Sequence, residues 1–145
     1  MKKQFKSTLF LMTILTIFTV SSQVDTNAII STKYADFYEY NSLQDEYIHD
    51  SDSSGWLDIE IIPYDDYYTI EINNDGEKDK IWWEHSNETV DGFDEDSHDI
   101  YYTEDGRKII FYYDDQEIYF FYDLSEIQDQ YLKLMTLSKI ETYEK

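Results

Sequence analysis

The sequence predicts an α+β fold in which an antiparallel meander of about six strands carries an N-terminal and a C-terminal helix packed on the sheet. Apolar residues recur at helical spacing near both ends of the folded region, but they alternate with polar residues in the middle of the chain. Turn-forming pairs such as Asp105-Gly106 separate the alternating runs. The 15 tyrosines and 8 phenylalanines among 145 residues supply the core of one domain.

The N-terminal residues 1–28 are predicted to form a secretory signal peptide. Three lysines within the first six residues precede a mostly apolar run over 7–20. Small residues at Thr26 and Ala28 predict cleavage after Ala28, with cleavage after Ser22 as the second choice. An uncleaved membrane anchor is the alternative, although the run is shorter than a bilayer span. Residues 29–145 then form a single acidic α+β domain.

The elements of this domain follow from the spacing of its apolar residues. Residues 33–48 carry them at spacings of three to five, which predicts an amphipathic helix, and the polar segment 49–55 predicts a turn. Strands are expected at 56–62, 67–72, 81–84, 100–103, 108–113 and 118–122, with the longest loop between 85 and 98. Ser125 and Gln128 form a capping-box pattern, which predicts a helix from 125 to about 143.

The predicted hairpin over residues 108–122 is apolar on both faces. An antiparallel sheet that faces water on one side alternates apolar and polar residues, so both faces of this hairpin should be covered. We expect a terminal helix on one face. The other face is expected to contact the second helix or a curled part of the same sheet, with a partner protein or a second copy of the chain as the alternative.

The composition is strongly acidic and contains no cysteine. Thirty-two Asp and Glu residues against 11 Lys and Arg give a formal net charge of −21, and removal of residues 1–28 would take it to −23. Such a chain lacks the basic clusters that neutralise phosphate, which argues against nucleic acid as a partner. Secretion without disulfides indicates a bacterial product.

These features predict a secreted, non-enzymatic binding protein that inhibits or neutralises a cationic protein, either a host defence protein or a toxin. An acidic surface attracts cationic partners, and Tyr and Trp are enriched at binding hot spots. The candidate contact residues are Trp56, Trp82, Trp83, Tyr101, Tyr112, Asp58, Glu60 and Glu84. No membrane contact is expected after removal of the signal peptide, and homo-oligomerisation stays open. An extracytoplasmic immunity protein, which neutralises a toxin at the cell surface, is the second alternative.

A calcium-binding extracellular surface protein is the first alternative. Asp50, Asp52, Ser54 and Asp58 match the spacing of ligands in a twelve-residue calcium loop, and Gly55 occupies the position of its turn glycine. The closing acidic residue of that loop is replaced by Ile61. A polar connector is therefore the competing interpretation, and no cofactor other than calcium is expected.

Catalysis is not expected from this sequence. The chain has no cysteine and no nucleophile motif near its histidines, His49, His85 and His98, which are expected at the surface. A small hydrolase with paired carboxylates is retained only as a minor alternative, because abundant acidic residues make any one pair uninformative.

Overall fold

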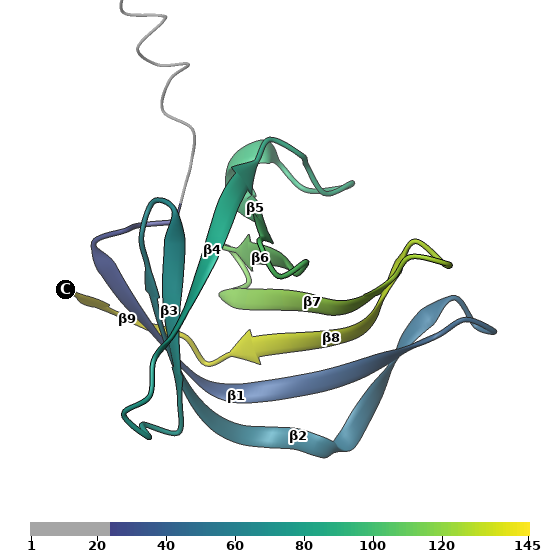
Figure 1. Cartoon of the computed structure of the whole chain (residues 1–145), viewed down its shortest axis with the longest axis horizontal. Coiled ribbons are helices and arrows are strands. Elements are labelled where there is room, and N and C mark those ends of the chain that lie inside the picture. Colours follow the sequence, from purple (N-terminus) through teal and green to yellow (C-terminus); the bar gives the residue numbers. More distant parts are fainter. Residues whose placement is uncertain (1–23) are drawn as a thin grey trace, which may run out of the picture.

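A computed structural model of the protein describes residues 24–145 as one antiparallel sheet (Figure 1). The only helical element in this part of the chain is a single 3-10 turn. The elements are β1 (Ala28–Asn41), β2 (Glu46–Pro63), β3 (Tyr67–Ile72), β4 (Asp79–Ser86), η1 (Glu95–Ser97), β5 (His98–Thr103), β6 (Lys108–Tyr112), β7 (Glu117–Ser125), β8 (Gln130–Ser138) and β9 (Glu141–Glu144).

The sheet closes on itself. Each strand from β2 to β8 pairs with the next, and β1 then pairs with both β8 and β2. The pair Tyr38↔Leu134 joins β1 to β8, whereas Ile30↔Ile61 joins β1 to β2. The short β9 extends the sheet beside the start of β1. Closure hides one face of the strands from β1 to β8 and gives the core a single interior, whereas all four residues of β9 are exposed.

The predicted helix over residues 33–48 is wrong, because this segment forms most of β1 and the start of β2. Asp45, with a φ of 54°, lies in the turn between them. At two register shifts β1 advances by two residues while β2 advances by three and by five, so the extra residues lie on β2. The deeply buried residues of β1 are Ile30, Thr32 and Ala35, and their spacing changes from two to three, which disturbs the period-two pattern expected of a strand.

The predicted helix over residues 125–143 is also wrong. The amide of Gln128 donates to Ser125 Oγ (3.4 Å), as the capping pattern suggests, but the chain then turns into β8. In β8, Leu137 faces the interior while Leu134 is buried on the opposite face. A strand with apolar residues on both faces carries no period-two signal, so its spacing does not distinguish it from a helix.

The six predicted strands lie within β2 to β7, and the interior is filled by their inward-facing side chains. Ile59, Ile61, Tyr68, Ile109, Ile118 and Phe120 are among the most deeply buried. This interior covers the inner face of the β6–β7 hairpin. Its outer face is covered by neighbouring side chains of the sheet and by the β4–β5 loop, where Phe93 lies 5.1 Å from Tyr112 between ring centroids. No terminal helix covers either face of this hairpin in residues 24–145.

Residues 24–27 precede β1 and lead the chain into the closed sheet. Val24 is only 5% exposed and belongs to the core. The Asn27 carbonyl accepts a hydrogen bond from the Lys145 amide (3.0 Å), and Ala28 pairs with Glu144. Residues 1–23 of the predicted signal peptide lie outside the described residues. Within residues 24–145, there is no helix of the length and apolar character needed to cross a membrane.

Candidate functional site

The predicted contact residues separate into core and surface positions. Trp83 and Tyr101 are each only 4% exposed, and their rings stack at 4.1 Å inside the closed sheet. Trp82 is 46% exposed on the outer face. Successive side chains of a strand point to opposite faces, so only one of two adjacent tryptophans on β4 can face outward. Trp82 is therefore the residue of this pair that is available to a partner.

A shallow depression of about 360 Å³ surrounds this exposed tryptophan on the outside of β4 and β5. It is lined by Asp66, Trp82, Trp83, Glu84, Tyr102, Thr103 and Glu104, and is called the Trp82 depression below. Three of its residues were predicted as contacts, Trp82, Trp83 and Glu84, although the Trp83 side chain is buried. Asp66, Tyr102 and Glu104 were missed, because they reach β4 only in the folded chain. Asp66 comes from the β2–β3 turn, Tyr102 from the neighbouring strand β5, and Glu104 from the β5–β6 turn.

Backbone hydrogen bonds fix the rim of the Trp82 depression. The Trp83 amide donates to the Asp66 carbonyl (2.9 Å), which holds the β2–β3 turn against β4. The Glu104 amide donates to the Trp82 carbonyl (2.9 Å), which holds the β5–β6 turn on the other side. Glu84 lies between them and pairs with Tyr102 across the sheet. Carboxylates from three separate segments are thereby held around one exposed ring.

The carboxylates of the depression differ from the other predicted acidic contacts in their electrostatic surroundings. Asp58 pairs with Lys33 (3.0 Å) and Glu60 with Lys78 (3.3 Å). Among residues 24–145, no ion pair or side-chain hydrogen bond engages the carboxylate of Asp66, Glu84 or Glu104. These three carboxylates are therefore uncompensated by a direct ion pair in the described part of the chain, although Lys80 and Lys108 contact the neighbouring rings of Trp82 and Tyr102. A further cationic group can approach the carboxylates themselves.

Aromatic rings beside the depression already contact cations of the same chain. Lys80 Nζ lies 4.3 Å from the Trp82 ring centroid and 4.0 Å from that of Tyr67. Such cation–π contacts are attractive because the ring face carries negative potential. Tyr102 contributes a ring at the other side, and its hydroxyl donates to Glu88. Burial, followed by this hydrogen bond, raises the pKa of Tyr102, so the hydroxyl stays neutral and adds no charge near neutral pH.

The other two predicted aromatic contacts lie outside the Trp82 depression. Trp56 is 74% exposed on β2, where Lys139 Nζ lies 5.0 Å from its ring centroid. Tyr112 belongs to the outer face of β6 and packs edge-on against Tyr119 at 4.9 Å. The structure does not gather the predicted aromatic contacts into one surface.

The predicted calcium ligands Asp50, Asp52, Ser54 and Asp58 all lie along β2 and not in a loop. The Asp50 carboxylate accepts hydrogen bonds from the amide and hydroxyl of Ser53, and these lower its pKa. Ser54 Oγ accepts from the Phe37 amide (2.9 Å). In the described part of the chain, no three His, Asp or Glu side chains converge in a geometry that could hold a metal ion. Calcium binding stays a prediction.

The expectation of surface histidines is wrong for His98, which is buried and accepts a hydrogen bond from the Val90 amide at Nε2 (3.0 Å). His85 is mostly buried and its Nε2 lies 2.8 Å from Asp99 Oδ1. The hydroxyl of Tyr113 donates to the other oxygen of this carboxylate. Sequence reasoning missed this network because its residues come from β4, from β5 and from the turn after β6. Asp99 is two residues before Tyr101 on β5, and both are buried.

The arrangement around Trp82 combines uncompensated carboxylates with an exposed ring, which suits recognition of an ammonium or guanidinium group. Its shallow shape gives no enclosed volume in which a reacting group would be shielded from water. Comparison with protein-family models, with curated proteins and with solved structures found no match.

Proposed function

We propose that this protein is a secreted, non-enzymatic binding protein that captures a cationic protein and thereby inhibits or neutralises it. The Trp82 depression anchors a lysine or arginine side chain of the partner. The observation that carries the proposal is that the carboxylates of Asp66, Glu84 and Glu104 lie around an exposed tryptophan and that none of them forms an ion pair within residues 24–145.

Long-range electrostatics favour the same kind of partner. With 32 acidic residues against 11 basic ones, the protein repels anions and attracts cations from a distance. This attraction raises the association rate, and it is screened by salt. The depression adds a local contact, because an aliphatic stem can pack on Trp82 while its charged end meets the carboxylates. A basic host defence protein or a basic toxin outside the cell would present such lysine and arginine side chains.

The direct test measures binding of an oligolysine peptide by isothermal titration calorimetry. The test variant neutralises the depression with Asp66→Asn, Glu84→Gln and Glu104→Gln. We expect it to lower the affinity at least roughly tenfold, which corresponds to about 1.4 kcal/mol. Raising the ionic strength should weaken binding to the unmodified protein, because exposed charges are screened beyond the Debye length.

A matched control separates a local site from the overall charge. The control variant carries Asp58→Asn, Glu60→Gln and Glu71→Gln, which removes the same charge from carboxylates that already contact Lys33 or Lys78. It should change the affinity much less than the test variant does. Equal losses in the two variants would show that net charge alone attracts the peptide, and would contradict the proposed site.

A further inference from the structure

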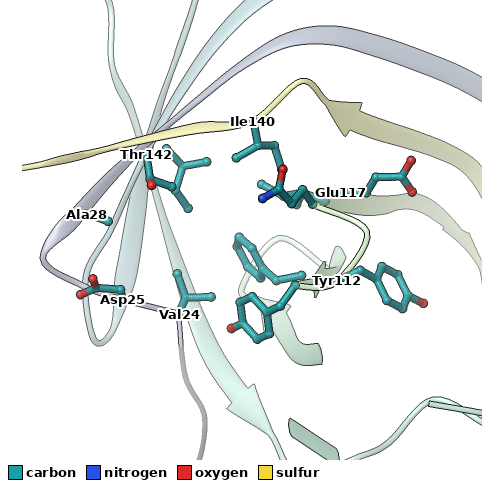
Figure 2. A pocket seen from close by; sticks show the side chains of 12 residues that line it. Val24, Asp25, Ala28, Tyr112, Glu117, Ile140 and Thr142 are labelled. Atoms are coloured by element: carbon teal, nitrogen blue, oxygen red, sulfur yellow. The ribbon is translucent and has the colours of Figure 1, made fainter. Parts of the chain in front are cut away.

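A second cavity lies at the open end of the closed sheet, away from the Trp82 depression. It measures about 240 Å³. Its apolar walls are formed by Val24, Ile30, Phe111, Ile118 and Ile140. Figure 2 shows Val24 from the N-terminal segment, Ala28 from the start of β1 and Thr142 from β9 around the cavity. Tyr112 and Glu117 lie on the side of the β6–β7 turn, and the Glu117 carboxylate is directed away from the cavity. The cavity reaches the core, because Ile30, Phe111 and Ile118 are core residues.

The backbone itself creates this opening. The ladder between β7 and β8 begins at Ile118↔Leu137, and β8 ends one residue later at Ser138. Lys139, with a φ of 55°, then turns the chain so that β9 pairs with β1 and diverges from β7. Among residues 24–145, β9 has no strand partner on its other edge. The cavity lies beside the resulting gap, between the residues at the start of β7 and those of β9.

The charged groups around the cavity are all negative, whereas Gln116, Tyr112 and Thr142 add neutral groups that can donate or accept hydrogen bonds. Tyr113 lines the wall and donates its hydroxyl proton to Asp99, which leaves the phenolic oxygen free to accept. The Asp99 carboxylate behind it is buried and also contacts His85. Asp25 and Glu117 add carboxylates at the rim. None of the 12 residues that line the cavity is basic.

We propose that this cavity binds a small organic cation with an apolar body and one ammonium group, such as an arylalkylammonium ion. The apolar walls take the body, and the phenolic oxygen of Tyr113 accepts a hydrogen bond from the ammonium group. A cavity of about 150 Å³ binds benzene, so this larger one accommodates roughly ten non-hydrogen atoms. A carboxylate ligand of the same size is repelled by Asp25, Glu117 and Asp99. The inference does not rest on the proposed capture of a cationic protein.

The test uses the chain that begins at residue 23, which cleavage after Ser22 would leave and which keeps the cavity residues Val24, Asp25 and Ala28. NMR follows its titration with three probes of similar size. The probes are 2-phenylethylammonium, the neutral 2-phenylethanol and the anion phenylacetate. We expect the ammonium ion to bind at least roughly tenfold more tightly than the alcohol, and the anion to bind most weakly. Amide signals of residues 111–118 and 140–142 should shift. Equal affinity for all three probes, or preference for the anion, would overturn the proposal.

Substitutions at two positions locate the binding. Thr142→Phe places a ring in the cavity from β9, where the residue is exposed, and should abolish binding, whereas Thr142→Ser should retain it. Tyr113→Phe removes the accepting oxygen and should lower the affinity of the ammonium ion more than that of the alcohol. Thermal melting of each variant checks that the fold persists. Binding of 2-phenylethylammonium to a folded Thr142→Phe protein with unchanged affinity would place the site elsewhere and overturn the proposal.

Discussion

Alkaline pH should unfold this protein because the fold holds many of its tyrosine hydroxyls neutral. Burial raises the pKa of Tyr101 to about 12, and burial together with nearby Glu117 raises that of Tyr119 to about 12. In an unfolded chain, both hydroxyls titrate near their ordinary value of 10.0. The folded state therefore binds these protons more tightly. The stability that they contribute is complete below pH 10 and is lost as the pH rises through 12.

The magnitude follows from the difference between the folded and unfolded pKa of one group. Tyr101 is almost fully buried, so solvent screening is small. A difference of about two pH units corresponds to roughly 3 kcal/mol. This is a large fraction of the 5–15 kcal/mol that is typical of a whole domain. Loss of this contribution, together with that of Tyr119, should be enough to unfold the chain.

Urea denaturation at a series of pH values measures the effect, with tyrosinate absorbance as a second readout. Between pH 10 and about 12, Tyr101→Phe should lower the slope of stability against pH by roughly 1.4 kcal/mol per pH unit. Near neutral pH, the slopes of the variant and of the unmodified protein should be equal. Identical slopes at alkaline pH, or a folded protein in which all tyrosines titrate near 10, would refute the reasoning.

Further predictions concern packing and the backbone. Leu137→Ala empties a fully buried position and should lower the free energy of unfolding by about 2–5 kcal/mol in urea; a loss below that range would mean that the core collapses around the site. Gly106→Ala forces alanine to a φ of 85° in the β5–β6 turn and should cost about 1–2 kcal/mol, whereas an unchanged midpoint would show that the turn relaxes. A chain that begins at residue 29 loses Val24, whose burial stabilises by about 1.5–3 kcal/mol, and should melt at a lower temperature than a chain that begins at residue 23. Equal melting temperatures would show that the N-terminal segment is dispensable.

The middle strands could be predicted because their alternation is local. Tyr68, Ile70 and Ile72 lie on one face of a regular strand, and the Asp105-Gly106 pair marks the turn between β5 and β6. The terminal strands could not be predicted in the same way. The buried positions of β1 change their spacing from two to three between Thr32 and Ala35, and β8 is apolar on both faces. Both patterns imitate a helix when only spacing is considered.

Closure of the sheet depends on contacts between residues that are distant in the sequence, and so does the Trp82 depression. The pairing of Tyr38 with Leu134 joins the two ends of the chain, and no local pattern encodes it. Exposed Trp82 and Glu84 could be predicted from residue type, but Asp66 and Glu104 reach the Trp82 depression through turns elsewhere in the chain. The burial of Trp83 follows from alternation once β4 is assigned.

The central claim is that a cationic partner contacts the Trp82 depression and not the acidic surface as a whole. An NMR titration with oligolysine tests it directly, because the indole signals of Trp56, Trp82 and Trp83 report on separate places. The Trp83 indole nitrogen donates to the Tyr64 carbonyl (3.0 Å) inside the fold. We predict that the Trp82 indole and the amides of residues 102–104 shift first, while the Trp56 indole is unchanged. Uniform small shifts over the acidic surface, or shifts confined to Trp56, would contradict the claim.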